Sequence, residues 1–396
     1  MIFLLSLGSV RGDTCPAPCV CRQYNAIVYC NSTGITTVPL NLPKNTTILK
    51  LSYNEIVCVP KAAFSGLKLL RDLDLRFNKL HDKSIELGAL NLSSIQTLDL
   101  SENQFSIVPE FPPNTSNLYF DSNPVMKLAA DSFLDSTLVQ NVYLRYCQIY
   151  AIEEHTFDPL INFRQIVLED NKLVDGSLAS DAFMKNQKLT DLDLSINQLQ
   201  TLPNTSYFPT SLRNLRILGN NIKIIPSNAF ESLTHLTSLE LWEGEITTLE
   251  DYAFDGLSKL ELLYLNEGHI SKLTNMTFGG DLNSLKMLDI SQNDITEISN
   301  GAFYKLNELQ HLSIGMNKLT TLKSEVLNTK YIPNLLDVFI DGNPWNCDCH
   351  LRWLREVMDN GTFRIPDPHL VTCNEPLELS GKAWDDLKSS DFICKT

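Results

Sequence analysis

Leucines alternate with polar residues in short segments that recur along most of the chain, and each segment leads to an asparagine. The pattern L-x-L-x-x-N-x-L appears in "LKLSYNEI", "LDLRFNKL", "LDLSENQF", "LDLSINQL", "LDISQNDI" and "LSIGMNKL". Strict alternation predicts a half-buried β-strand, with leucines on the buried face and the intervening residues on the other face. The asparagine position falls at residues 54, 78, 103, 123, 147, 171, 197, 220, 244, 268, 293, 317 and 343.

The spacing between these positions is 20 to 26 residues, most often 24. A repeat of this length and pattern indicates a leucine-rich repeat, in which each unit forms one strand, a bend and a return segment. We therefore predict an α/β leucine-rich-repeat solenoid of about thirteen units over residues 46–343. Its parallel sheet should be curved, and the convex side should be irregular with short helices.

The return segments carry phenylalanines at the same period, which should stack as a buried spine inside the convex wall. They are Phe64, Phe133, Phe157, Phe183, Phe230, Phe254, Phe278 and Phe303. Three returns are proline-rich, "VPLNLPKNTTIL", "VPEFPPNTSNL" and "LPNTSYFPTSL", and should run extended.

Three units replace the asparagine. Cys147 occupies the position in the fifth unit, where a small, weakly donating thiol is tolerated, so we expect a buried and unreactive cysteine. Gly244 and Gly268 remove the side chain altogether. At those two bends either water replaces the amide or the bend changes shape.

Eight of the ten cysteines form two terminal clusters. This arrangement favours disulfide-bonded ends in an oxidising compartment, with three possible connectivities in each cluster. Zinc is the alternative for C-x-C spacings, but CxxC pairs and finger-spaced histidines are absent from the sequence. Cys58 lies alone after the first bend, and a link from it to a second chain would form a dimer.

The ends resemble those of extracellular leucine-rich-repeat proteins. "CPAPCVCRQYNAIVYC" is similar to that family's N-terminal cap, and "NPWNCDCHLRWLREV" with "VTCNEP", "LSGKAWDDL" and Cys394 to its C-terminal cap. The resemblance implies caps at residues 13–45 and 344–396, with Trp345 and Trp353 packed in the second. It also implies the disulfides Cys15–Cys21, Cys19–Cys30, Cys347–Cys373 and Cys349–Cys394, and a role like that of receptor ectodomains, guidance factors or innate-immune sensors.

The N-terminus and the sequons suggest export. Residues 1–12, "MIFLLSLGSVRG", look like a signal peptide, either complete or truncated, and the "RGD" at 11–13 straddles the expected cleavage point. No other apolar stretch is long enough to span a bilayer. We expect a secreted glycoprotein with acceptor sites at Asn31, Asn45, Asn91, Asn114, Asn204, Asn275 and Asn360.

The net charge of −15 argues against nucleic-acid binding and permits a protein partner with basic patches. The seven histidines are dispersed, and the sequence contains no HExxH, GxSxG, P-loop or GxGxxG motif. We expect no enzyme activity, no cofactor and no metal site.

The residues between the inward leucines supply the candidate binding surface, the concave face. Acids outnumber bases there, which wet surfaces often show without any function, but large uncharged residues such as Val167 and several aromatics interrupt them. An aromatic residue ringed by acids is typical of a protein-binding hot spot. We take as ligand-binding candidates Asp74, Asp99, Tyr119, Tyr143, Arg145, Asp193, Trp242, Tyr264 and Asp289.

Three functions remain open: an extracellular recognition module that binds a protein ligand, a matrix or adhesion protein, and a non-catalytic subunit of a secreted enzyme. The first predicts that binding weakens as salt rises, and that Trp242→Ala removes more than about 2 kcal/mol of binding free energy.

Overall fold

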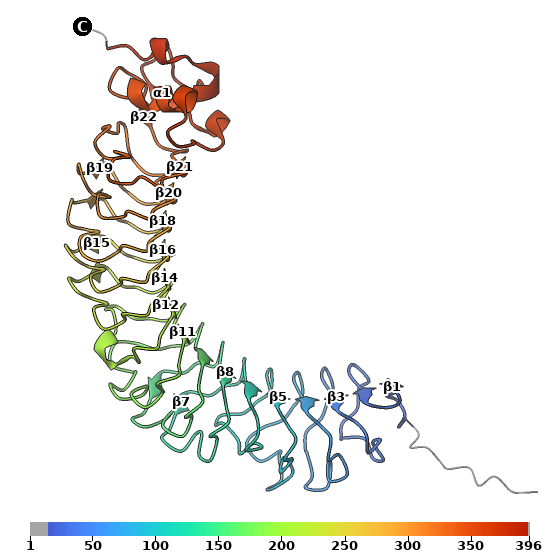
Figure 1. Ribbon diagram of the computed structural model, residues 1–396. Helices are drawn as coiled ribbons and strands as arrows, with labels where there is room; N and C mark the ends of the chain where they lie inside the picture. Colours follow the sequence, from blue (N-terminus) through green and yellow to red (C-terminus); the bar gives the residue numbers. More distant parts are fainter. Residues whose placement is uncertain (1–14, 395–396) are drawn as a thin grey trace, which may run out of the picture. The chain divides into compact units, whose positions relative to one another are not determined.

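The computed structural model describes residues 15–394 and divides into two compact units, Met1–Val167 and Leu168–Thr396. Both are stacks of coils that each contribute one short strand to a parallel sheet (Figure 1). The signal-peptide and RGD predictions fall on residues 1–14, outside the described range.

The first unit begins with the antiparallel hairpin of β1 (Val20–Arg22) and β2 (Ile27–Tyr29). β2 then pairs in parallel with the first repeat strand, so the cap continues the sheet of the repeats. The repeat strands follow in chain order: β3 (Ile48–Lys50), β4 (Asp72–Asp74), β5 (Thr97–Asp99), β6 (Asn117–Tyr119), β8 (Asn141–Tyr143) and β10 (Gln165–Val167).

The second unit has the same pattern, and among its described residues seven repeat strands follow in chain order: β11 (Asp191–Asp193), β12 (Asn214–Arg216), β14 (Ser238–Glu240), β16 (Leu262–Tyr264), β18 (Met287–Asp289), β20 (His311–Ser313) and β21 (Asp337–Phe339). Its C-terminal end holds β22 (Trp345–Asn346), β23 (Cys373–Glu375) and the helix α1 (Arg352–Asn360). The thirteen repeat strands match the predicted units one for one, and the solenoid prediction is confirmed.

The return segments consist mainly of turns. Three two-stranded ladders lie among them: β7 (Lys127–Leu128) with β9 (Ala151–Ile152), β13 (Ile224–Ile225) with β15 (Thr248–Leu249), and β17 (Lys272–Leu273) with β19 (Glu297–Ile298). The expectation that all three proline-rich returns are extended is wrong for the third. There Asn204 caps a 3-10 helix, Thr205–Tyr207, by accepting from the Ser206 backbone N–H at 3.1 Å.

The repeat asparagines join the backbones of two neighbouring coils. The Asn103 amide donates to the carbonyls of Leu75, Leu100 and Ser101 at 3.0 to 3.1 Å, and its Oδ1 accepts from the Leu80 N–H at 3.0 Å. The side chain is buried. It therefore satisfies polar groups at a bend that water does not reach, and the same arrangement recurs from coil to coil.

Cys147 is fully buried and keeps part of this arrangement, as predicted. Its Sγ lies 3.4 Å from the Phe120 carbonyl and 3.3 Å from that of Arg145. Burial raises the pKa of the thiol to about 12, so it is protonated and unreactive at neutral pH.

The two glycine bends keep backbone contact with the next coil: the Gly244 N–H donates to Glu267 O and the Gly268 N–H to Gln292 O. A Cβ at Gly268 would lie 2.9 Å from Asn293 Oδ1, which explains why this bend excludes a side chain.

The residue before the asparagine position adopts a left-handed conformation in coil after coil, which the sequence analysis did not foresee. Large side chains stand at several of these positions, including Tyr53 (φ 56°), Phe77 (φ 52°) and Tyr146 (φ 56°). Residues other than glycine, asparagine and aspartate rarely adopt this conformation. It turns these side chains out of the bend, where they remain exposed.

The predicted phenylalanine spine is confirmed. All eight side chains are buried, and in the second unit Phe230, Phe254, Phe278 and Phe303 stack at centroid distances of 5.8 to 6.0 Å. Phe105, Phe120, Phe163 and Phe208 are also buried, although they lie outside the periodic context that identified the others.

All four predicted disulfides are present. Trp345 is buried in the C-terminal cap as expected, with its ring 6.2 Å from that of Trp384. Trp353 is half-buried on α1, and its indole N–H donates to Leu322 O at 2.8 Å, which ties α1 to the last return segment.

Candidate protein-binding faces

The outward side chains of the sheet form two surfaces, one on each unit, which we call the first face and the second face. The first face comprises the outward residues of β3, β4, β5, β6, β8 and β10 and their bends, and the second face those of β11, β12, β14, β16, β18, β20 and β21. Strand pairing places equivalent residues of neighbouring coils side by side. Each outward position of the repeat therefore forms a row of side chains that runs across the coils.

Two stacked aromatic pairs distinguish the first face. Tyr119 and Tyr143 are direct neighbours on β6 and β8, and their rings are parallel, with centroids 4.5 Å apart. Tyr53 and Phe77, at the left-handed bend positions, stack at 4.3 Å. Each pair fixes the orientation of its rings at half-buried or exposed sites.

Arginines stand beside both pairs. The Arg145 guanidinium lies 5.5 Å from the Tyr143 ring centroid, and that of Arg76 lies 5.9 Å from the Tyr53 centroid. Arg145 also approaches Asp121 at 3.7 Å, and Arg76 approaches Asp99 at 3.9 Å. The first face therefore combines ring surfaces with fixed charges of both signs.

Burial limits two of the predicted contact residues. Asp74 is 3% exposed and pairs with Lys50 and Arg76, and Asp193 on the second face is 8% exposed and accepts from the Ser195 N–H. Both carboxylates therefore interact mainly with neighbouring groups of the same face and offer little surface to a ligand. Val167, expected to be outward-facing, is 1% exposed and contributes nothing to the surface.

Asp99 is half-buried and shows a perturbed titration. Burial raises the pKa of its carboxyl, although the Ser101 backbone and hydroxyl oppose the shift by donating to it. The surroundings of Asp99 therefore disfavour its charged form relative to water.

A pocket of about 270 Å³ opens on the first face. Its lining comes from four successive coils and consists of Arg76, Phe77, Asp99, Ser101, Glu102, Tyr119, Asp121, Ser122 and Tyr146. Phe77 and Tyr146 belong to the two outer coils, and the small Ser101 and Ser122 to the two inner ones. Sequence reasoning picked out Asp99 and Tyr119 but could not see that the coils enclose a pocket.

The second face has single aromatics set among acids. Tyr264 on β16 is flanked in register by Glu240 and Asp289, and burial raises the pKa of its hydroxyl. The Trp242 indole N–H donates to Glu240 at 3.4 Å, while Glu240 pairs with Arg216 at 2.9 Å. The Asp289 carboxylate accepts from the Ser291 backbone N–H and hydroxyl.

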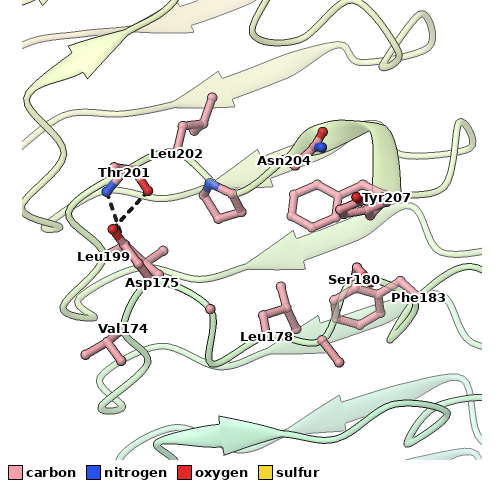
Figure 2. Close-up of a pocket in the computed structure, with 14 residues that line it drawn as sticks. Val174, Asp175, Leu178, Ser180, Phe183, Leu199, Thr201, Leu202, Asn204 and Tyr207 are labelled. Atoms are coloured by element: carbon pink, nitrogen blue, oxygen red, sulfur yellow. Dashed lines mark hydrogen bonds between the residues drawn. The ribbon is translucent and has the colours of Figure 1, made fainter.

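A separate pocket of about 200 Å³ lies among return segments of the second unit (Figure 2). Apolar side chains such as Phe183, Leu199 and Tyr207 line most of it. Its one carboxylate, Asp175, accepts from the Thr201 N–H at 3.1 Å and hydroxyl at 2.9 Å. This pocket lies beside the irregular return at residues 202–212, where a 3-10 helix replaces the usual turn.

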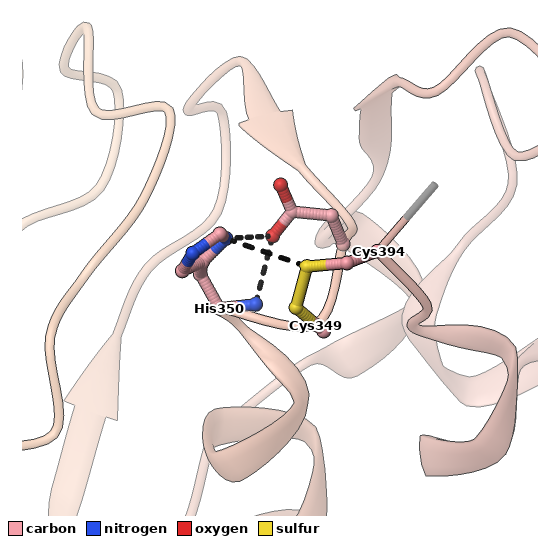
Figure 3. A group of neighbouring side chains, drawn as sticks. Cys349, His350 and Cys394 are labelled. Atoms are coloured by element: carbon pink, nitrogen blue, oxygen red, sulfur yellow. Dashed lines mark hydrogen bonds and ion pairs between the residues drawn. A yellow bond between two sulfur atoms is a disulfide. The ribbon is translucent and has the colours of Figure 1, made fainter. Parts of the chain in front are cut away.

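Asp348, Cys349, His350 and Cys394 gather in the C-terminal cap (Figure 3). Residue types alone would suit a metal ion. However, the two sulfurs are joined in a disulfide, and Asp348 Oδ1 accepts from the His350 N–H at 2.8 Å and lies 3.0 Å from its Nδ1. The group is therefore explained as a structural element of the cap.

Six of the seven sequon asparagines are exposed, and Asn114 is half-buried. Cys58 is partly exposed and is not in a disulfide. Glycosylation and a Cys58-linked dimer both remain predictions. No helix within residues 15–394 combines the length and the apolar character needed to cross a bilayer.

The coils, the buried asparagines at their bends and the disulfide caps together define the class of leucine-rich-repeat proteins with capped ends. The family model described as "BspA type Leucine rich repeat region" matches residues 126–261 and 223–338, more than half of the chain, and general leucine-rich-repeat models match residues 30–80 and 94–118. The chain belongs to the leucine-rich-repeat family.

Its relatives include two small leucine-rich proteoglycans. Mouse keratocan is 26% identical over 92% of this chain and 87% of its own length, and rat osteomodulin is 27% identical over 57% of this chain and 48% of its own. Because these relatives are matrix proteins and the chain carries disulfide caps, an extracellular setting fits it.

Two solved structures extend the likeness. The leucine-rich-repeat part of FLRT2, solved in an octameric complex with Latrophilin 3 and Unc5D, superposes with a TM-score of 0.65 at 25% identity, over 94% of this chain and 98% of that one. Toll, solved with Spatzle from Drosophila, gives 0.66 at 20% identity over 90% and 59%, which supports the fold alone.

Proposed function

We propose that the chain is a secreted, non-catalytic recognition module that binds a basic protein ligand through its two faces. The observation that carries the proposal is the half-buried Tyr119–Tyr143 stack, with Arg145 beside it in an ion pair with Asp121. Rigid aromatic side chains lose little conformational entropy on binding and form most interface hot spots. The surrounding acids would orient a basic partner and speed its approach.

The second face supports a complementary contribution. Trp242 and Tyr264 offer ring surface, while Glu243 and Glu267 project exposed carboxylates from left-handed bends. We propose that Trp242 and Tyr264 are anchors there, and that the second face supplies most of the electrostatic attraction. The likeness to FLRT2, whose repeat domain is part of a protein assembly, supports such a role.

The kinship with keratocan and osteomodulin favours one alternative, a matrix protein whose partner is an insoluble assembly rather than a soluble ligand. Fractionation separates the two functions, since a discrete ligand co-purifies in solution and a matrix partner pellets with the chain.

The test is capture from native extracellular fluid with the full chain, followed by mass spectrometry. Capture with the Tyr119→Ala/Tyr143→Ala variant should lose the ligand. The matched control is Tyr304→Ala/Tyr331→Ala, which removes a pair stacked at 4.0 Å on return segments of the second unit. Loss of the ligand only in the first variant supports the proposal, and equal capture by both variants contradicts it.

A further inference from the structure

We propose that the pocket on the first face is a receptor for an arginine side chain of the protein ligand. The inference rests on the proposed function and adds the chemistry of the contact. It starts from the pocket's size: about 270 Å³ is room for one long side chain and far too little for a folded segment.

The charges of the pocket favour a cation. Three carboxylates line it, those of Asp99, Glu102 and Asp121, against the single guanidinium of Arg76. Arg76 is already engaged, with its Nε 3.6 Å from Asp74 and 3.9 Å from Asp99. Asp121 faces Arg145 at 3.7 Å. A positive group entering the pocket would therefore meet excess negative charge.

Glu102 is the carboxylate most available to a ligand. It is exposed, it projects from a left-handed bend (φ 54°), and within residues 15–394 it has no ion-pair partner. Its coil lies between the coils of Phe77 and Tyr146. A guanidinium held by Glu102 would thus have ring surface available on either side.

The aromatic lining selects a guanidinium over an ammonium. Phe77 and Tyr119 are each fixed by a stacked neighbour, Tyr53 and Tyr143, so their rings do not reorganise when a ligand enters. A planar guanidinium stacks on such rings and pairs in a bidentate way with a carboxylate, whereas an ammonium ion acts as a point charge. The face already uses this contact internally, with Arg145 over Tyr143 at 5.5 Å.

The experiment is calorimetric titration of the full chain with N-acetyl-arginine amide, its neutral isostere N-acetyl-citrulline amide, and N-acetyl-lysine amide. A single side chain of this size should bind with a Kd on the order of 1 mM. Citrulline should bind about tenfold more weakly, because it lacks the charge, and lysine should fall between the two. Equal binding of arginine and citrulline would overturn the inference.

Matched variants locate the site. Glu102→Gln should weaken arginine binding about five- to tenfold. Glu267→Gln is the control, because Glu267 occupies the same left-handed position in a coil of the second unit and is also exposed. Tyr146→Leu should weaken binding about threefold. An equal loss in the control, or no loss in Glu102→Gln, would show that arginine binds elsewhere and defeat the inference.

The two proposals fail separately. If a captured protein ligand depends on Tyr119 and Tyr143 while arginine amide does not bind, the pocket inference is wrong and the proposed function stands. If arginine amide binds through Glu102 and capture is insensitive to the tyrosines, the pocket stands and the proposed function is wrong.

Discussion

The first and second faces are built on coils of the same kind, yet they offer a partner different kinds of contact. On the first face aromatic rings stack in pairs with arginines beside them, as in Tyr119, Tyr143 and Arg145. On the second face Trp242 and Tyr264 stand singly among carboxylates. The comparison shows that the repeat determines where outward side chains lie, and that the variable positions alone decide what a face can bind.

The largest expected effect concerns what the units share. Asn103→Ala in the first unit and Asn317→Ala in the second should each reduce the free energy of unfolding by about 2–4 kcal/mol. Each substitution leaves one buried backbone N–H, that of Leu80 or Ile295, without its acceptor, and removes one of the donors to three carbonyls. Native-state hydrogen exchange, which reports each unit separately, measures both losses.

Cys147→Ala is the control for that prediction. A thiol forms only weak hydrogen bonds, such as those to the Phe120 and Arg145 carbonyls at 3.4 and 3.3 Å, so its loss should reduce stability by about 1 kcal/mol. If one asparagine proved dispensable, the two units would not share one scaffold.

The next effect concerns what distinguishes the faces. Tyr119→Ala and Trp242→Ala should each reduce the free energy of ligand binding by more than about 2 kcal/mol. Only Tyr119 has a stacked partner, so Tyr119→Ala/Tyr143→Ala should depart from additivity by about 1 kcal/mol. Surface plasmon resonance of the captured ligand gives both values. Strict additivity would mean that the stack is not a binding unit.

The exposed acids of the second face should affect the rate at which the ligand associates. Glu243→Gln/Glu267→Gln on the second face should slow association several-fold at low salt and have little effect at high salt, since exposed charges are screened over about 10 Å at 0.1 M. Dissociation should change little. If the double variant alters only the dissociation rate, these acids contact the ligand directly and the division of labour between the faces is wrong.

The smallest effect is in the pH dependence of stability. Burial raises the pKa of Asp99 in the folded state above its unfolded-state value. The folded state therefore becomes less stable as the pH rises from the unfolded-state pKa to the folded-state pKa of this carboxyl. Asp99→Asn should therefore stabilise the first unit slightly at neutral pH, by less than about 1 kcal/mol, and remove that acid-range dependence.

Asp294 in the second unit provides the opposite case. Hydrogen bonds from Lys318 and His269 lower its pKa, so its contribution is present above the unfolded-state pKa and is lost as pH falls through the folded-state value. Asp294→Asn should slightly destabilise at neutral pH. Acid titration of unfolding for both variants tests the two signs, and shifts in the same direction would contradict this account.

Much of the fold could be predicted from the sequence because the leucine–asparagine pattern reports backbone needs directly. The buried middle residue of each strand, the ladder at positions such as Asn103, and Cys147 as its substitute all follow from that pattern. The disulfides followed from resemblance of the cap motifs. Positions where geometry overrides the pattern were missed, as with the 3-10 helix after Asn204 and the role of Trp384.

The candidate sites were less predictable, because a repeat pattern says that a residue is outward but not how much of it is exposed. Asp74 and Asp193 proved buried beneath their neighbours. Tyr146 and Glu102 gained importance from left-handed bends that no residue type at those positions suggests. The pocket depends on the lateral spacing of four coils, which the repeat pattern does not give.

Hydroxyl-radical footprinting of the captured complex tests the central claim most directly, because it reports protection of individual side chains. The account predicts that bound ligand protects Phe77, Tyr119 and Tyr146, while Tyr304 and Tyr331 on the return segments react as in the free chain. Protection confined to return segments or to the caps, with the first face unchanged, would contradict it.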